Sequence, residues 1–467
     1  MAPKYSLKDG VYLIKGALRG AIMDTNSGLV YSINSQGCKV CAYKVEDDQY
    51  WHALVSMGIA GEIERACPQE LPRSMENDHL KFMWFEIATN ECNQRCIHCY
   101  TNSMPQNSRG DLLTKDFSPS IAQPKSRMLY KDWLRVIKQA RELGCKACQF
   151  IGGEPLLYRG EKGETVIELA GFAKKVGYSS VEIFTNATLL TPDNILKIKE
   201  MGIKVAVSLY SDDPIIHNSV TQTPGSYAKT VSSLALLKKF GVETRVETVV
   251  MKANQESVES TKSFIRKMGL HGRKPDLVRP NGRGEKSLIQ PVDKTLIQYG
   301  FMLTPLFKAS RKKIAHYKSR HSCLNGKLVI TEFGDILPCI FAREHILGNY
   351  LAQNNLCEVI CCSELQGIWH TTKDHVAVCQ DCEYRYVCFD CRPLAEAAAQ
   401  GRVDFRSAPY PRCTYNPYSG EWGNGIWIVD RDGKPYYDKS MALEIRQVRQ
   451  SIERSSNMMI GEMNYEG

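Results

Sequence analysis

The segment Cys92-Asn-Gln-Arg-Cys96-Ile-His-Cys99 is the most informative stretch of this chain, because it places three thiols in one short loop directly after an apolar run. Cysteine thiolates are the usual protein ligands of [4Fe–4S] clusters. Three of them can hold three irons and leave the fourth iron without a protein ligand, and an open coordination position is typical of a reactive metal centre. Structural zinc is the alternative, but it normally needs four ligands, and His98 is the one local candidate for the fourth.

Bulk composition limits the classes of protein to which the chain can belong. With 467 residues, 43% of them hydrophobic and 24% charged, the chain has the composition of a globular protein with two or three domains. We find no apolar run of membrane-spanning length and no secretion signal, and therefore expect a cytoplasmic protein that does not bind a membrane. Eighteen cysteines in a reducing compartment indicate metal binding rather than a disulfide framework. The net charge of +9 is modest and the basic residues are scattered, which argues against a nucleic-acid partner.

A repeated strand–helix alternation runs from Leu80 to about Leu303. Amphipathic stretches that end at glycines separate the expected strands, and each glycine suits a helix C-terminus. Right-handed crossovers then predict an α/β fold, a partial (β/α)6 barrel of the TIM type with its chemistry at the carboxyl ends of the strands. A polar segment, Thr101–Ser126, is expected to be a long loop over that face. The expected strands are Lys81–Thr89, Ala147–Ile151, Ser180–Thr185, Lys204–Leu209 and Glu243–Met251.

The regions on either side of the barrel are expected to form two further domains. Residues 1–75 contain three short strand-like runs, VYLIKG, AIMDT and LVYSIN, followed by two helical stretches, which predicts a winged-helix-like module. The barrel is assigned to residues 76–305, and residues 306–467 form a cysteine-rich domain with a C-terminal tail. That last region shows little hydrophobic periodicity, so we expect metal ligation to supply its folding energy.

Four further polar or glycine positions fall at the ends of the expected strands or on them. Gly152-Gly153-Glu154-Pro155 closes the second strand, Asn186 ends the third, Ser208 ends the fourth and Arg245 lies on the fifth. Two glycines allow close backbone approach to a ligand, although this tetrapeptide alone could be a simple turn. Together with the C-x3-C-x-His-C segment, these positions resemble the radical S-adenosylmethionine (SAM) superfamily over roughly residues 80–300.

The resemblance implies a role for each of these residues. In that family the open iron chelates SAM, and an electron from the cluster cleaves SAM to a 5′-deoxyadenosyl radical that abstracts a substrate hydrogen. The metal ligands would be Cys92, Cys96 and Cys99. The Gly152–Pro155 motif, with the Glu154 carboxylate, would bind the amino group of SAM. Asn186 and Ser208 would contact the ribose or the methionyl carboxylate, Arg245 would pair with that carboxylate, and His98 and Tyr100 would flank the adenine.

Ten more cysteines lie between Cys323 and Cys413. Cys323-x10-Gly334-x4-Cys339, followed by Cys379-x2-Cys382-x5-Cys388-x2-Cys391 and Cys413, resembles the SPASM extension, which binds up to two auxiliary [4Fe–4S] clusters. The last quartet spacing, x2, departs from the family's x3. The resemblance assigns Cys379, Cys382, Cys388 and Cys413 to an outer cluster, and Cys323, Cys339 and Cys391 to an inner one. A fourth inner ligand would be Cys357, Cys361 or Cys362, or the position would be open for a substrate thiolate. A pair of zinc sites is the alternative.

The five remaining thiols, Cys38, Cys41, Cys67, Cys145 and Cys148, are expected to be buried and without metal. With a small module ahead of the barrel, the chain resembles ribosomal-peptide maturases. The resemblance implies that residues 1–75 bind the leader of a precursor peptide as an added strand, and that the enzyme installs a thioether or another crosslink. An electron donor such as ferredoxin or flavodoxin is implied. The alternatives are a sulfatase-maturase-like oxidation of Cys or Ser, a non-catalytic iron–sulfur or zinc protein, and an N-terminal unit that only stabilises the fold. No catalytic acid or base can be singled out.

Overall fold

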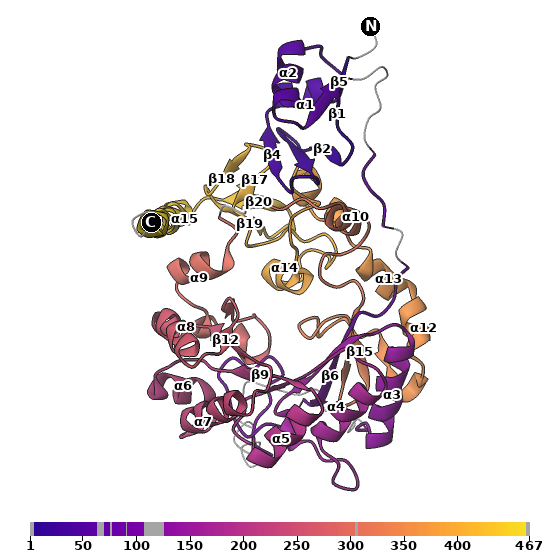
Figure 1. Ribbon diagram of the computed structural model, residues 1–467, viewed down its shortest axis with the longest axis vertical. Coiled ribbons are helices and arrows are strands. Elements are labelled where there is room, and N and C mark those ends of the chain that lie inside the picture. The colour runs from indigo at the N-terminus through magenta and orange to yellow at the C-terminus, as the bar shows by residue number, and fades with distance from the viewer. Residues whose placement is uncertain are drawn as a thin grey trace. The chain divides into compact units, whose positions relative to one another are not determined.

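The computed structural model describes residues 4–62, 70–74, 77–89, 91–106, 126–303 and 307–463 (Figure 1). Two compact units divide the chain. The barrel unit comprises Asp78–Tyr299 and Gly326–Gln366, and the terminal unit comprises Met1–Asn77, Gly300–Asn325 and Gly367–Gly467. The units therefore interleave along the sequence, whereas the three expected domains follow one another. Cys67 and most of the expected loop Thr101–Ser126 lie outside the described residues.

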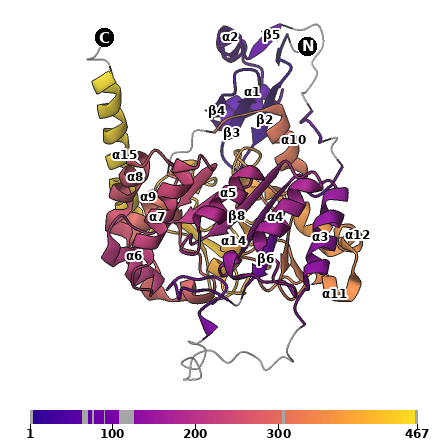
Figure 2. The ribbon, with the colours of Figure 1, turned by 60° about the horizontal axis from the view of Figure 1, so that its bottom comes forward.

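A nine-stranded sheet forms the centre of the barrel unit, in the order β12-β10-β9-β8-β7-β6-β14-β15-β16. All neighbouring pairs from β6 to β12 are parallel, which confirms the expected α/β architecture. Figures 1 and 2 show α3, α4 and α5 beside this sheet. The strands are β6 (Phe82–Ala88), β7 (Ala147–Gly152), β8 (Ser180–Thr185), β9 (Lys204–Ser208), β10 (Thr244–Glu247) and β12 (His271–Gly272). The helices are α3 (Tyr130–Glu142), α4 (Val166–Lys175), α5 (Pro192–Glu200), α6 (Pro214–Thr221), α7 (Ser226–Lys239) and α8 (Val258–Lys267).

The fifth expected strand, Glu243–Met251, is interrupted. Its first half is β10, which stays in the large sheet, and its second half is β11 (Val249–Val250). β11 instead pairs in parallel with β13 (Asp276–Leu277). The change of partner brings residues 276–285, where no strand was expected, to the carboxyl end of the barrel.

One strand lies where no regular core was expected. β14 (Lys327–Thr331) pairs in parallel with β6, and β15 (Asp335–Leu337) and β16 (Gly348–Asn349) continue the sheet antiparallel. Leu328, Val329 and Ile330 are fully buried. The expectation that the region after residue 305 has too little hydrophobic pattern to form a core is therefore wrong for this segment, because the short run KLVIT finds its cover at the open edge of the barrel sheet. After β16 come α11 (Tyr350–Gln353), α12 (Leu356–Cys361) and α13 (Ser363–Trp369).

Basic side chains connect neighbouring helices at the end of the barrel where the strands begin. A residue in the last turn of α3, α5 or α7 donates to the carbonyl of the glycine that follows α4, α7 or α8, respectively. These glycines have positive φ, as a helix C-terminus requires, and the cations interact with carbonyls at the negative end of a helix dipole. The pairs are Arg141 with Gly177, Lys199 with Gly241, and Lys238 with Gly269.

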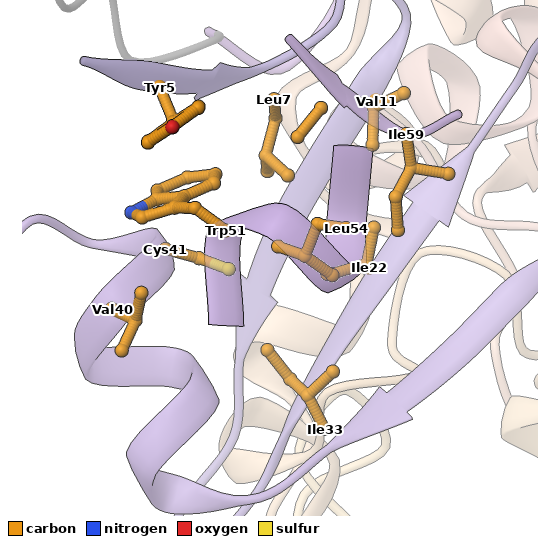
Figure 3. Close-up of a cluster of buried hydrophobic side chains, with 11 residues drawn as sticks. Tyr5, Leu7, Val11, Ile22, Ile33, Val40, Cys41, Trp51, Leu54 and Ile59 are labelled. Atoms are coloured by element: carbon orange, nitrogen blue, oxygen red, sulfur yellow. The ribbon is translucent and has the colours of Figure 1, made fainter. Parts of the chain in front are cut away.

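The terminal unit begins with the expected three strands and two helices. β2 (Val11–Lys15), β3 (Gly20–Asp24) and β4 (Val30–Ile33) form an antiparallel sheet, followed by α1 (Ser35–Cys41) and α2 (Asp48–Ser56). A further pair, β1 (Tyr5–Leu7) and β5 (Ala60–Glu62), closes the module. Figure 3 shows the core, in which Trp51 and Leu54 of α2 pack with Val11 and Ile22 of the sheet.

Both faces of this small sheet are buried, although one face alone belongs to the module's own core. Tyr12, Ile14, Ala21 and Met23 point the other way and share a second core with Tyr384, Tyr386, Val387 and Tyr415. Alternate residues of a strand point to opposite faces, so the unbroken apolar run VYLI serves two cores at once. The N-terminal residues are thus not a free-standing module, and the cysteine-rich region owes part of its stability to hydrophobic packing.

The remaining elements of the chain are α9 (Asp293–Gly300), α10 (Arg311–Ser319), α14 (Arg392–Ala399), β17 (Tyr415–Asn416), β18 (Glu421–Trp422), the hairpin β19 (Ile426–Val429) and β20 (Pro435–Asp438), and α15 (Ala442–Met463). Within the described ranges, none of the helices combines the length and the apolarity that a membrane span requires. Cys41, Cys145 and Cys148 are buried and Cys38 is half-buried.

Candidate functional site

A cavity of about 190 Å³ opens at the carboxyl ends of the parallel strands, and the three cysteines of the first cluster line it. Six other residues predicted from the sequence line the same cavity: His98, Tyr100, Gly152, Gly153, Asn186 and Ser208. Phe184, Tyr210, Phe341 and Leu277 add an apolar wall that sequence analysis did not anticipate. The predicted positions at the ends of four separate strands therefore meet in one place.

The three thiols of the loop lie close to protein dipoles, and Cys92 is buried whereas Cys96 and Cys99 are half-buried. The backbone N–H of Gln94 donates to the Cys92 sulfur at 3.3 Å, and the Cys99 sulfur lies 3.3 Å from the Thr101 hydroxyl. Burial, with a smaller contribution from the neighbouring Cys99, raises the pKa of Cys96 to about 12. The Cys96 thiol is thus protonated at neutral pH, and a metal that binds it must displace the proton.

The spacing of the sulfurs bears on the kind of metal group that fits. Among the residues that the structure describes, no three His, Cys, Asp or Glu side chains converge on the position of a single ion. A tetrahedral zinc site needs its ligands about 2.3 Å from one metal atom, whereas a four-iron cluster presents separate irons to separate thiolates. The donor set in this loop, three thiols around a cavity, fits a cluster with one open iron.

Arg283 holds the cysteine loop by hydrogen bonds to its backbone carbonyls, a role that was not predicted. Its Nε donates to the Cys96 carbonyl at 2.7 Å, one terminal nitrogen donates to the Ser103 carbonyl at 2.8 Å, and its own N–H donates to the Cys99 carbonyl at 3.1 Å. Gly282 permits this approach, because an added Cβ would lie 2.6 Å from the Cys99 carbonyl oxygen. The one usable signal was the Asn281-Gly282 pair, which favours a tight turn.

The two glycines of the Gly152–Pro155 motif form the closest backbone approach in the cavity. Gly152 has φ of +141°, and an added Cβ on Gly153 would lie 2.1 Å from the Glu91 carbonyl oxygen and 2.6 Å from that of Ala88. The N–H of Gly153 donates to the Ala88 carbonyl at 2.7 Å. Only glycine fits at these positions, and the main chain itself therefore forms this part of the cavity wall.

Glu154 has a structural position rather than a place in the cavity lining. Its carboxylate is fully buried and accepts from the Leu156 N–H at 3.0 Å, the Thr185 hydroxyl at 2.6 Å and the Asn186 N–H at 2.9 Å. Burial raises its pKa. The carboxylate therefore joins the ends of β7 and β8, and Pro155 begins the short 3-10 turn that follows. The expected contact of Glu154 with the SAM amino group stays a prediction.

The remaining strand-end residues differ in whether they line the cavity. The Asn186 amide donates to the Asn93 side chain at 2.8 Å, and Ser208 lines the cavity. Arg245 instead forms a bidentate pair with Glu182, at 2.8 and 2.7 Å, and also pairs with Glu247. It does not line the cavity, so its expected pairing with the methionyl carboxylate remains untested.

Two aromatic groups flank the cysteine loop. Burial, helped by the Arg283 charge, lowers the pKa of His98 to about 4, so the imidazole is neutral at pH 7. Its ring centroid lies 4.9 Å from that of Tyr210 in an edge-on arrangement. Tyr100 donates from its hydroxyl to Glu86 at 3.1 Å, and Arg343 binds the same buried carboxylate at 2.8 and 2.9 Å. This triad joins the first cysteine loop to the segment after β15.

Buried His217 on α6 predicts a pH dependence of stability. Its Nδ1 accepts the Tyr210 N–H at 3.3 Å, and burial lowers its pKa to about 4, below the unfolded value near 6.5. Protonation therefore favours the unfolded chain, and the stability present above pH 6.5 is lost as the pH falls. Between pH 6.5 and 5 the loss is about 2 kcal/mol. Thermal unfolding at pH 7.5 and 5.0 should show a smaller fall for His217→Gln than for the wild type. Exposed His271→Gln is the control, and equal falls in all three proteins would contradict the assignment.

The second cysteine region contains a separate cavity within the terminal unit. Cys379, Cys382, Cys388 and Cys413, the four thiols predicted to form the outer set, all line it. The cavity has a volume of about 30 Å³. Burial raises the pKa of Cys413 to about 12. Residues separated by up to 34 positions in the sequence thus present four thiols to one enclosed space, and this donor set fits a cluster with four protein ligands.

The predicted inner set is divided between the two units. Cys323 and Cys391 belong to the terminal unit, where the Cys323 N–H donates to His321 at 3.0 Å and Cys391 precedes α14. Cys339 belongs to the barrel unit and packs with Tyr100 and Phe341. The three candidates for a fourth ligand are on or next to α12, which packs against α3, and Cys357 and Cys361 are exposed to solvent. The inner assignment therefore remains a prediction.

Known proteins resemble this chain in sequence and in fold. Residues 87–265 match the sequence model of the radical SAM superfamily. An AdoMet-dependent heme synthase of Methanosarcina barkeri is 23% identical over 356 residues, which cover 70% of this chain and 94% of that protein. The antilisterial bacteriocin subtilosin biosynthesis protein AlbA of Bacillus subtilis is 26% identical over 282 residues, 57% of this chain and 56% of AlbA. The structure of Streptococcus suis SuiB bound to precursor peptide SuiA has a TM-score of 0.51 at 14% identity, covering 87% of this chain and 98% of SuiB. This last similarity is one of fold alone.

Proposed function

Residues 87–265 form a radical SAM domain, and from this premise we propose that the enzyme is a peptide maturase that crosslinks a ribosomally made precursor. The observation that carries the proposal is the combination of two features in one chain. One is the cavity with three thiols and a glycine-walled backbone, and the other is a small sheet with an exposed edge strand. The similarity to AlbA supports a peptide substrate, and the fold similarity to SuiB extends well beyond the radical SAM domain.

The residues around the cavity have complementary tasks in this proposal. Cys92, Cys96 and Cys99 would hold a [4Fe–4S] cluster, and the backbone of Gly152 and Gly153 would lie against SAM. When bound, these groups supply a 5′-deoxyadenosyl radical through one-electron reductive cleavage of SAM. The apolar wall of Phe184, Tyr210 and Phe341 would exclude water, and so protect a reactive species from quenching.

The preferred product is a thioether, and its atoms and electrons balance as follows. The peptide loses one hydrogen atom, which ends in 5′-deoxyadenosine, and one thiol proton, which passes to solvent. One electron also leaves the peptide when the carbon–sulfur bond forms, and it needs an acceptor. The four-cysteine cavity is the part of the chain with ligands for an auxiliary cluster, which would serve as that acceptor. The initial electron comes from a donor of the ferredoxin or flavodoxin type.

Recognition of the leader is assigned to β4. Among the strands that the structure describes, β4 pairs with β3 alone and is an edge of its sheet, so a peptide can add to it as a fourth strand. Ser32 is exposed. The Leu29 carbonyl accepts the Asp24 N–H, so the backbone groups of Leu29 and of every second residue after it face β3. Ser32 lies in the alternate set, and its N–H therefore points away from β3 and towards an added strand.

Replacing Ser32 by proline should weaken peptide modification by about tenfold, because it removes one backbone donor from the added strand. Ser32→Ala is the matched control, since it keeps the N–H and loses the same side-chain contacts. Both variants should form 5′-deoxyadenosine at the wild-type rate without peptide. Equal modification by the proline and alanine variants would exclude this edge as the leader site. Deletion of the whole module is a poorer test, because it would expose the second core around Tyr384 and Tyr415.

The substrate class is tested directly with the full-length protein. The chain is reconstituted anaerobically with iron and sulfide, then incubated with SAM, dithionite and the peptide encoded by a short reading frame next to the gene. A peptide lighter by two hydrogens, together with 5′-deoxyadenosine, is the expected result. Conversion of a sulfatase-motif peptide to formylglycine instead would support the sulfatase-maturase alternative and overturn the proposal.

A further inference from the structure

Lys373 is a buried lysine beside the four-cysteine cavity, and none of the steps above uses it. Its side chain is about 6% exposed, and its Nζ donates to the Cys379 sulfur at 3.5 Å. The ammonium also lies 5.5 Å from the centroid of the Tyr410 ring. A buried lysine is rare without a partner charge, so its position calls for an explanation.

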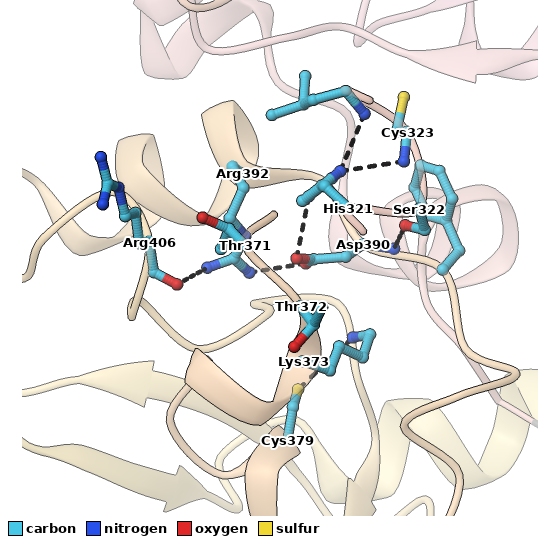
Figure 4. A network of polar contacts seen from close by, with 12 residues as sticks. His321, Ser322, Cys323, Thr371, Thr372, Lys373, Cys379, Asp390, Arg392 and Arg406 are labelled. Carbon is cyan, nitrogen blue, oxygen red and sulfur yellow. Dashed lines mark hydrogen bonds and ion pairs between the residues drawn. The ribbon is translucent and has the colours of Figure 1, made fainter. Parts of the chain in front are cut away.

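Asp390 is an acidic group that interacts electrostatically with Lys373, and two other residues contact its carboxylate directly. Asp390 accepts from Arg392 at 2.6 Å through one carboxylate oxygen, and its other oxygen lies 3.3 Å from the His321 ring. Figure 4 shows this network and, beside it, the contact of Lys373 with Cys379. The Arg392 guanidinium is itself fully buried and also donates to the Ala408 carbonyl at 2.7 Å. The direct contacts of the Asp390 carboxylate are thus with Arg392 and His321, whereas Lys373 acts on it electrostatically.

The other cation on the cavity wall is also engaged elsewhere. Arg385 lines the same space, but its Nε donates to Asp374 at 2.9 Å and one terminal nitrogen donates to the carbonyls of Lys15 and Cys382. The rest of the cavity wall is nearly apolar apart from the four thiols, with Val378, Pro409 and Trp427 among its members. Of the two cations in the described part of the chain that line this cavity, Lys373 therefore donates to a thiol, whereas Arg385 donates to a carboxylate and to carbonyls.

We propose that Lys373 is the counter-cation of the four-cysteine site and raises the reduction potential of the iron–sulfur cluster held there. The inference rests on the proposed function, because it takes the auxiliary cluster as given. A four-thiolate cluster carries net negative charge, and reduction adds one more. A fixed positive charge within hydrogen-bond distance of one ligand sulfur, in an apolar surrounding, therefore stabilises the reduced form more than the oxidised form.

A higher potential suits the task assigned to this site. The electron released when the peptide crosslink forms must be accepted, and a cluster that is easier to reduce accepts it more readily. Lys373 would act through the Cys379 sulfur and would not touch the peptide, so it is a positioning and tuning residue rather than a catalytic one.

The test is a redox titration of the full-length protein. The three cysteines of the first loop are replaced by alanine to remove the SAM cluster, and Cys413→Ala in this background identifies the signal of the outer cluster. Reduction is followed by electron paramagnetic resonance against mediator potential. At a fixed potential, Lys373→Met should lower the reduced-to-oxidised ratio of that cluster at least tenfold, which corresponds to 59 mV for one electron. Lys373→Arg, which keeps the charge, and Lys434→Met, on the exposed hairpin, should stay within twofold of the parent.

The possible results distinguish a failure of the counter-cation role from a failure of its premise, the auxiliary cluster. An unchanged potential in Lys373→Met, with the cluster present, overturns the counter-cation role and leaves the auxiliary site intact. If Cys413→Ala removes neither iron nor signal, there is no cluster in this cavity, and both the site and the inference are overturned. Should Lys373→Met fail to load iron, the arginine variant decides: loading with arginine supports a need for charge, whereas failure of both indicates a packing role and overturns the inference.

Discussion

Replacing Cys96 by alanine is expected to reduce 5′-deoxyadenosine formation below detection. The Cys96 side chain lines the cavity and its carbonyl is held by Arg283 at 2.7 Å, so the substitution removes one of three thiols and little else. Two thiols cannot hold a cluster that needs three, and without the cluster SAM has no reductant at its sulfonium. The measurement is chromatographic detection of 5′-deoxyadenosine after anaerobic reconstitution and addition of SAM and dithionite.

Cys145→Ala is the matched control for this experiment. Cys145 is also a cysteine of the barrel unit, and it is buried whereas Cys96 is half-buried, but it precedes β7 and does not line the cavity. We expect it to keep wild-type iron content at the first site and at least half of the wild-type rate. Comparable product formation by Cys96→Ala and the wild type would mean that these thiols are not the reactive site.

A second large effect is expected from Gly153→Ala, which should weaken SAM binding at least a hundredfold although it removes none of the three thiols. The added methyl group would lie 2.1 Å from the Glu91 carbonyl oxygen and 2.6 Å from that of Ala88, both backbone atoms. Neither can move without displacing the end of β6 and the cysteine loop that follows it. The clash therefore acts on the wall of the cavity itself.

The contrast with Gly272→Ala makes this prediction specific. Gly272 lies in β12 of the same sheet, and its nearest contact for an added Cβ, the Ile265 side chain, is at an ordinary 3.5 Å. Calorimetric titration with SAM, on samples matched for iron content, should show wild-type affinity for this control. A Gly153→Ala protein that binds SAM as tightly as the control would show that the glycine wall is not the SAM site.

The sequence predicted most of the barrel because its signals are local. β8 has the expected bounds, Ser180–Thr185, since an apolar alternation between two turn residues defines a strand without reference to the rest of the chain. β14 was missed because its run of three apolar residues, Leu328–Ile330, lies about 25 residues beyond the end of the expected strand–helix alternation and carries no sign of the sheet edge that covers it. The shared face of β2 was also missed, although the unbroken run VYLI is typical of a strand buried on both sides.

The site was predicted unevenly for a similar reason. Cysteine spacing and paired glycines are read along the chain, and the structure brings these positions into one cavity. Arg283 contacts backbone carbonyls about 180 residues away, and such contacts leave no periodic or compositional trace. The hydrogen bonds that the Glu154 carboxylate accepts from Leu156, Thr185 and Asn186 were likewise not indicated by its motif, because they depend on how the ends of β7 and β8 lie together.

The basic residues that connect neighbouring barrel helices bear on which end of the barrel can change conformation. Arg141, Lys199 and Lys238 join helix to helix at the rim where the strands begin. The cavity lies at the other rim, where the strands end. We therefore expect the base of the barrel to be held together more firmly than its mouth, so that loops around the cavity can adjust to a bound substrate without loosening the frame that carries them.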